Sequence, residues 1–194
     1  MTNYSNVLED IIFPSFIRSC VPDVNLEELK RESYLIQQNE ESIKASNYNG
    51  YHSPARKNTE KCENYKNFEQ LIHIVKEFAQ DTANHYNLNL KLSHLYWWVN
   101  INKSYQYNFL HAHFRADLIG AYYINCSKDC GDLTIVRKDG SEYGNLYSGR
   151  YDMLEMGTVA EPGRLFLIPG HLWHYVKANE SHEDRISVAF NIYF

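Results

Sequence analysis

The spacing of apolar residues along the chain changes near residue 90. Before that point, apolar positions recur every three or four residues in two segments, which begin at Asn25 and Asn67 and predict two helices. After it, the period falls to two, which is typical of half-buried strands. The chain is therefore expected to be mainly β with N-terminal helices, an α+β protein. Strands are predicted over 90–102, 117–125, 131–137, 163–168, 173–178 and 185–194.

Residues near the helix ends refine these limits. Glu27 and Glu28 fall in the first turn of the first helix, where the helix dipole favours acids. Asn67, followed three residues later by Gln70, predicts a side-chain cap for the second helix, which is expected to end near Tyr86.

Three other segments break the periodic pattern. Residues 11–22 are apolar but interrupted by Pro14, which predicts an edge or irregular strand. Residues 39–64 are polar and predict a long surface connection. Residues 138–162 fit either a solvated hairpin excursion or a lid over a cleft, and their length favours the lid.

Composition and charge bound the class of protein. A length of 194 residues with 44% hydrophobic content fits one domain, with a core at 90–194 and a supporting strand and helices at 1–89. The formal net charge of −5 lacks the basic excess that nucleic-acid binding requires, which argues against nucleic acid as a partner. No apolar run approaches the roughly 18–20 residues that span a bilayer, and the first residues lack a secretion signal. We therefore expect no membrane association and a cytoplasmic location.

The cysteines do not indicate a scaffold of their own. No two of them form a CxxC pair, so neither a disulfide framework nor a zinc knuckle is predicted. Reduced thiols are expected at Cys20, Cys62, Cys126 and Cys130.

Histidines supply the first candidate chemistry. His111 and His113 are separated by one residue, so on a strand both imidazoles would point to the same face and provide half of a metal site. A third ligand is available at His174, which stands at the start of a later predicted strand. His171, in the turn before it, is expected to be a surface residue or a group behind the ligands.

The last predicted strand has two different faces. One carries only apolar residues and is expected to be core. On the other, Arg185 is followed two residues later by Ser187, with Ala189 and Asn191 beyond. Such a face is either solvated or an anchor for a carboxylate, because the guanidinium fork and a hydroxyl match two carboxylate oxygens.

Taken together and in order, these motifs resemble the 2-oxoglutarate and Fe(II)-dependent dioxygenase superfamily. More closely, they resemble a group of 2OG-Fe(II) oxygenases from bacteria and marine phages, with the similarity covering roughly residues 97–194. The order and spacing of several motifs carry the resemblance, not any one of them. The motifs are Asn108 with His111-Ala112-His113, the strand Leu118 to Asn125 that contains Tyr122-Tyr123, Gly131-Asp132, the segment Pro162 to Pro169, His174, and Arg185-Ile186-Ser187.

The resemblance implies a fold and a set of site residues. The fold would be a double-stranded β-helix, a jelly-roll or cupin-like core. His111, His113 and His174 would be the catalytic residues that hold Fe(II). Arg185 and Ser187 would bind the distal carboxylate of the cosubstrate 2-oxoglutarate, and Tyr123 would contact that cosubstrate, with O2 as the oxidant. The nearby aromatic residues either wall this site or pack in the core, and alternation does not separate the two roles: Tyr96, Trp97, Trp98 and Trp173.

One departure from the superfamily pattern affects the metal. The usual ligand set is two histidines and one carboxylate, and His113 stands where the acid is expected. Three arrangements remain open: three histidines, two histidines with water, or two histidines with Asp117 as the carboxylate. We favour His111, His113 and His174.

The activity that the resemblance implies is hydroxylation of a protein or peptide side chain, or of a small metabolite, with release of succinate and CO2. Nucleic-acid demethylases of the AlkB type carry a second Arg where this chain has Asn191, so that subtype is disfavoured. A homodimer is compatible with the sequence. If the protein is phage-encoded, its location would be the host cytoplasm.

Two alternatives use the same residues differently. A non-enzymatic cupin-like or ligand-binding jelly-roll module would hold Zn²⁺ or nothing in its histidines. A metal-dependent isomerase or a cysteine-dioxygenase-like cupin would bind iron through three histidines without 2-oxoglutarate. Arg185 and Ser187 argue against both, because neither needs a carboxylate anchor at that place.

Overall fold

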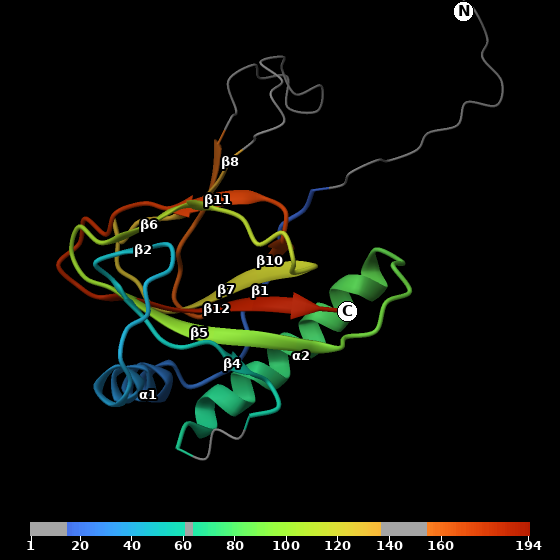
Figure 1. Cartoon of the computed structure of the whole chain (residues 1–194), viewed down its shortest axis with the longest axis horizontal. Helices are drawn as coiled ribbons and strands as arrows, with labels where there is room; N and C mark the ends of the chain where they lie inside the picture. The colour runs from blue at the N-terminus through green and yellow to red at the C-terminus, as the bar shows by residue number, and fades with distance from the viewer. Residues whose placement is uncertain (1–14, 61–63, 137–154) are drawn as a thin grey trace, which may run out of the picture.

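Two antiparallel β-sheets face each other, and two helices cover the outer face of the larger sheet (Figure 1). The computed structural model describes residues 15–60, 64–136 and 155–194. The larger sheet has the strand order β1-β10-β7-β12-β5-β3, with β4 also paired to β5, and the smaller sheet has the order β2-β6-β11-β8-β9. The helices are α1 (Leu26–Asn39) and α2 (Lys66–His85). The strands are β1 (Arg18–Cys20), β2 (Asn47–Tyr48), β3 (Tyr51–His52), β4 (Arg56–Lys57), β5 (His94–Asn102), β6 (Tyr107–His111), β7 (Leu118–Asn125), β8 (Leu133–Val136), β9 (Glu155–Thr158), β10 (Leu165–Pro169), β11 (Trp173–Val176) and β12 (Arg185–Tyr193).

All six predicted strands of the C-terminal half are present, as β5, β7, β8, β10, β11 and β12. The predicted strand at 11–22 is present as the short β1, and residues 11–14 lie outside the described part. Of the predicted 138–162 loop, residues 155–158 form β9, which pairs with β8. Residues 138–154, and with them the expectation of a lid, also lie outside the described part.

The main hydrophobic core lies between the helices and the larger sheet. Helix α2 buries one stripe of side chains, as its 3.6-residue period predicts. Phe68 of that stripe stacks on Trp97 of β5, with ring centroids 5.0 Å apart. Alternation along β5 sends Trp97 and Val99 into this core, while Trp98 and Asn100 face the opposite sheet. Neither of the two described helices has the combination of length and apolarity needed to cross a bilayer.

The predicted cap of helix α2 is wrong. Tyr65 occupies the cap position without a side-chain hydrogen bond, and Asn67 lies inside the helix. The first turn is instead satisfied by Glu32 of α1, whose buried carboxylate accepts from the backbone N–H of Asn67 (3.3 Å), from its Nδ2 (2.8 Å) and from the N–H of Phe68 (3.3 Å). A carboxylate placed there also opposes the positive end of the helix dipole, so one side chain joins the two helices.

The surface connection predicted for 39–64 is only partly correct. Its residues supply edge strands to both sheets, because β2 pairs with β6 while β3 and β4 pair with β5. Gly50 to Ser53 are buried within it. The segment therefore crosses from one sheet to the other at one end of the molecule.

We predict that Glu32→Gln destabilises the protein by about 1–3 kcal/mol, because a neutral amide cannot accept all three hydrogen bonds and loses the favourable charge at the helix end. Chemical denaturation measures the change. Glu77→Gln, at an exposed position in the middle of α2, is the matched control and should change stability by less than about 0.5 kcal/mol. Equal effects of the two variants would contradict the capping role.

Candidate active site

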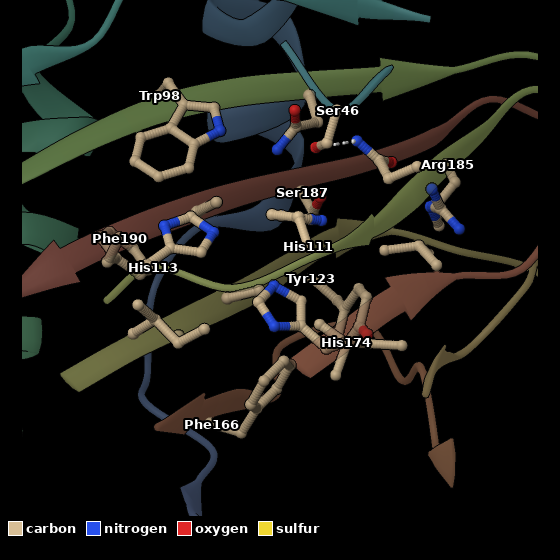
Figure 2. Close-up of a pocket in the computed structure, with 18 residues that line it drawn as sticks. Ser46, Trp98, His111, His113, Tyr123, Phe166, His174, Arg185, Ser187 and Phe190 are labelled. Carbon is tan, nitrogen blue, oxygen red and sulfur yellow. Dashed lines mark hydrogen bonds between the residues drawn. The ribbon is translucent and has the colours of Figure 1, made fainter. Parts of the chain in front are cut away.

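Three histidines converge between the two sheets. The nearest ligand nitrogens of His111, His113 and His174 all lie within 4.8 Å of one another, a group that could hold a metal ion. His111 is the last residue of β6 and is the direct cross-strand partner of His174 on β11. Figure 2 shows the three rings side by side at the edge of a cavity.

His113 reaches the group by a route that the sequence did not predict. It lies beyond the end of β6 and not on the same strand face as His111. Its backbone N–H donates to the carbonyl of Gly170 at 2.9 Å, and Gly170 N–H donates to the carbonyl of Asp117 at 3.0 Å. A Cβ at Gly170 would overlap the carbonyl oxygen of Ala116, so glycine at this turn allows the His113 loop to lie against it.

Hydrogen bonds to oxygen acceptors orient all three rings. His111 Nδ1 lies 2.6 Å from the carbonyl of Phe109, and His174 Nδ1 lies 2.9 Å from the carbonyl of Leu172. His113 Nδ1 lies 2.6 Å from Asn191 Oδ1. With the amide so oriented, each acceptor is an oxygen that cannot donate, so each Nδ1 carries the proton and each Nε2 keeps its lone pair. That tautomer is the one that metal-binding histidines of this kind require.

The electrostatics of the group keep it neutral. Burial, reinforced by the neighbouring imidazoles, lowers the pKa of His113 to about 4 and that of His174 to about 3. Burial also lowers the pKa of His111. Neutral imidazoles at physiological pH are competent ligands for a divalent metal.

Asp117 does not join this group. Its side chain is exposed, and its carboxylate accepts the backbone N–H of Phe194 at 2.9 Å. His171 is also exposed, as expected from its place in the turn. Among the described residues, the only group of three or more ligand side chains in this region is therefore the three histidines.

The three histidines share a cavity of about 70 Å³ with all three residues predicted to bind a cosubstrate, namely Tyr123, Arg185 and Ser187 (Figure 2). Arg185 is only 2% exposed. No carboxylate of the described residues lies within ion-pairing distance of its guanidinium, although burying an unpaired charge is costly. The site therefore offers a buried positive charge to an anion.

Backbone carbonyls fix the position of Arg185. Its Nη1 donates to the carbonyls of Gly131 (2.9 Å), Cys130 (3.1 Å) and Lys177 (3.3 Å). Gly131 has a φ of +86°, and a Cβ there would overlap the Lys177 carbonyl. Glycine is thus required for the three carbonyls to meet around Nη1 of Arg185.

Tyr123 and Ser187 are cross-strand neighbours on β7 and β12. Tyr123 is 2% exposed, and burial raises its pKa to about 12 despite opposing effects from the Thr158 hydroxyl and Arg185. The phenol therefore stays protonated and can donate a hydrogen bond.

Comparison with known protein families identifies the family to which this chain belongs. The model of the family described as "Putative 2OG-Fe(II) oxygenase" matches residues 96–191, a range that contains the three histidines and the three proposed cosubstrate residues. This chain belongs to the 2OG-Fe(II) oxygenases. The cofactors of this oxygenase are accordingly Fe(II) and 2-oxoglutarate, with O2 as cosubstrate. No curated protein matches the sequence.

Solved structures confirm the double-stranded β-helix fold. A prolyl-4-hydroxylase from Pseudomonas putida is similar with a TM-score of 0.63 at 10% identity, covering 91% of each chain. The epimerase SnoN of nogalamycin biosynthesis gives 0.63 at 14% identity, covering 91% of this chain and 77% of the other. A prolyl hydroxylase from Trichoplax adhaerens, in complex with a peptide of hypoxia inducible factor, gives 0.62 at 13% identity and covers 91% of this chain and 83% of the other.

Sequence reasoning missed several residues of the oxygenase site. Asn191 was placed on the polar face of the last strand, where related demethylases have an arginine, but its role in orienting His113 was not predicted. Trp98 lines the cavity, while its neighbour Trp97 packs in the core. The sequence pattern alone did not say which of these aromatic residues wall the site and which pack in the core. Ser46 reaches the cavity from the segment predicted as a surface connection, and nothing in its local sequence marks it.

We predict that Asn191→Leu weakens metal binding about 10- to 100-fold, because His113 loses the acceptor that fixes its tautomer and ring orientation. Asn191→Asp is the matched control, since a carboxylate still accepts from Nδ1 and should keep metal affinity near that of the wild type. Anaerobic calorimetric titration with Fe(II) measures both. Equal losses in the two variants would show that Asn191 has no orienting role.

The depressed pKa values also predict how metal-free protein responds to acid. His113 and His174 bind protons more weakly when folded, at about 4 and 3 against an ordinary value of 6.5, so their contribution to stability is complete above 6.5 and is lost as the pH falls toward the folded values. Thermal unfolding in the presence of a chelator should show this loss between pH 6.5 and 4. A His174→Gln variant should lose less stability over that range, and an unchanged pH slope would contradict the assignment.

Proposed function

We propose that this oxygenase holds Fe(II) through His111, His113 and His174 and anchors 2-oxoglutarate through Arg185. The observation that carries the proposal is the buried guanidinium, which shares a cavity with three convergent imidazoles and forms no ion pair with a carboxylate of the described residues. The donor set suits the metal, since neutral imidazole is a common ligand of Fe(II). Three histidines replace the usual two histidines and a carboxylate, so the metal with its protein ligands would have a net charge one unit more positive than in the usual set.

Each residue then has a distinct task. Arg185 and Ser187 bind the distal carboxylate of 2-oxoglutarate, which places the keto acid end toward the histidines. Tyr123 donates a hydrogen bond from its protonated hydroxyl to the same ligand. The apolar side chains of Phe166, Leu133 and Ile119 line the cavity and exclude water. Fe(II) held by the histidines would activate O2, so that one oxygen atom enters succinate as 2-oxoglutarate loses CO2 and the other hydroxylates the substrate.

We propose a side chain of a peptide or protein as the substrate. Large apolar residues next to the histidines are exposed to an unusual degree, with Phe109 at 49%, Leu110 at 41% and Phe114 at 67%. Clusters of this kind are typical of surfaces that bind another chain. Two structural neighbours act as prolyl hydroxylases, and one of them holds a peptide. A small metabolite is the second candidate, because the neighbour SnoN is an epimerase of a biosynthetic pathway.

We predict that Arg185→Lys raises the 2-oxoglutarate concentration needed for half-maximal turnover roughly 10- to 100-fold, since an ammonium cannot replace the charged fork at both oxygens. Metal affinity should not change. Arg115→Lys, at an exposed position, is the control and should leave both quantities unaltered. Succinate release measured against 2-oxoglutarate tests the prediction, and an unchanged requirement in Arg185→Lys would remove Arg185 from the cosubstrate site.

The substrate class is tested by incubating the protein with Fe(II), ascorbate, 2-oxoglutarate and a cellular protein digest, followed by mass spectrometry. Hydroxylated peptides that depend on 2-oxoglutarate and are missing with His174→Ala would support a peptide substrate. Hydroxylated small molecules from a metabolite extract, with no modified peptide, would favour the second candidate. Failure to form succinate with any extract would contradict the oxygenase activity itself.

A further inference from the structure

A second cavity is lined by two of the three histidines, His111 and His113. It has a volume of about 410 Å³ and shares four lining residues with the first cavity. The shared residues form the boundary between the two: Ser46, Trp98, His111 and His113. Arg185, Ser187 and Tyr123 line only the first cavity. A molecule in the second cavity would therefore reach the metal ligands without occupying the proposed cosubstrate site.

Planar rings form one wall of this second cavity. His52 stacks on Trp98 with ring centroids 5.4 Å apart and planes within 13°, and Trp98 stacks on His113 at 6.0 Å and 8°. This column of rings runs from the edge strand β3 to the histidine group. Figure 2 shows Trp98 lying alongside His113.

Two other lining residues are apolar and exposed. Phe109 and Leu110 line the cavity from β6. Phe109 lies edge-on to both Tyr48 and Tyr107, whose own rings stack at 4.7 Å. Aromatic contacts therefore hold Phe109 in place, although half of its surface is available to a ligand.

His52 is a buried polar residue that lines this second cavity. It is 6% exposed, and its Nδ1 lies 2.8 Å from the carbonyl of Ser53. Because that carbonyl can only accept, Nδ1 carries the proton and Nε2 is an acceptor. No described residue donates a hydrogen bond to Nε2. The backbone of Ser53 is fixed in turn by the bond from its N–H to the Val99 carbonyl, at 2.9 Å.

We infer that the second cavity binds an aromatic side chain of the substrate that carries a hydrogen-bond donor at its far end, as the phenol of tyrosine does. The inference rests on the proposed function, because it assigns the cavity to the substrate of that same site. The ring would contact Trp98 and Phe109, and its hydroxyl would donate to His52 Nε2. A residue close to this tyrosine in the substrate peptide would then lie next to the metal.

The test uses N-acetyl-L-tyrosinamide and N-acetyl-L-phenylalaninamide, two probes that differ only in the donor. Their affinities are measured by ligand-detected NMR on protein loaded with Zn(II) and 2-oxoglutarate. We expect tyrosinamide to bind roughly three- to tenfold more tightly, the value of one hydrogen bond to a buried acceptor. Equal affinities, or no binding of either probe at millimolar concentration, would overturn the inference.

Variants assign the preference to one residue. His52→Phe keeps the stacked ring and removes the acceptor, so it should abolish the preference for tyrosinamide and leave phenylalaninamide binding unchanged. His73→Phe makes the same substitution at an exposed position of α2 and should retain the preference. A preference that survives in His52→Phe would overturn the role of His52. If this variant does not fold, the difference in affinity between the two probes on wild-type protein still tests the inference.

The position of the probe relative to the metal is measured by replacing Zn(II) with Mn(II). Broadening of the tyrosinamide ring signals by Mn(II) would support a subsite next to the histidines, and its absence with Mn(II) bound would overturn it. Failure to bind metal or 2-oxoglutarate would contradict the proposed function and not the subsite. In that case, titration of metal-free protein with the two probes tests the aromatic subsite independently of the metal.

Discussion

The register of strand β12 is the constraint on which the rest of the structure depends. β12 lies in the middle of the larger sheet, paired over its whole length with β5 and along most of it with β7. Its alternation divides the molecule, because Ile186, Val188, Phe190 and Ile192 enter the core under the helices. The opposite face carries the polar residues of the site, namely Arg185, Ser187 and Asn191. A slip of one residue would exchange the two faces, so core packing and site geometry are fixed by the same pairing.

Burial of Arg185 is the energetic cost of this arrangement. A guanidinium removed from water needs strong partners, and three backbone carbonyls supply part of the compensation. They can approach one nitrogen together because residue 131 is a glycine with a positive φ. The carbonyls carry no net charge, so in the proposed function the distal carboxylate of 2-oxoglutarate would supply the counter-charge to the guanidinium. Stability of the protein and affinity for a dicarboxylate would then be linked through one side chain.

Much of this organisation follows from the sequence, because it depends on local periodicity. Six of the eight described strands after residue 90 and the two faces of β12 were predicted from spacing, while β6 and β9 were not. The set of three histidines was favoured once several motifs together showed the resemblance to the dioxygenases. The cap of α2 was not, since Glu32 lies on another helix and no local pattern reveals a partner 35 residues away. His113 joins the site through a turn against Gly170, a contact between distant segments. Asn191 and His52 act through tertiary contacts of the same kind, which a residue-type pattern does not encode.

The account depends on metal and 2-oxoglutarate meeting in one cavity, and anaerobic titration tests this most directly. Fe(II)-loaded protein is titrated with 2-oxoglutarate while the visible charge-transfer band produced by keto acid chelation is followed. The account predicts that the band appears in wild-type protein, is lost in His174→Ala, and needs much more 2-oxoglutarate in Arg185→Lys. Absence of the band at millimolar 2-oxoglutarate, with Fe(II) shown to be bound, would contradict it and indicate that these histidines serve a cupin-like protein without this cosubstrate.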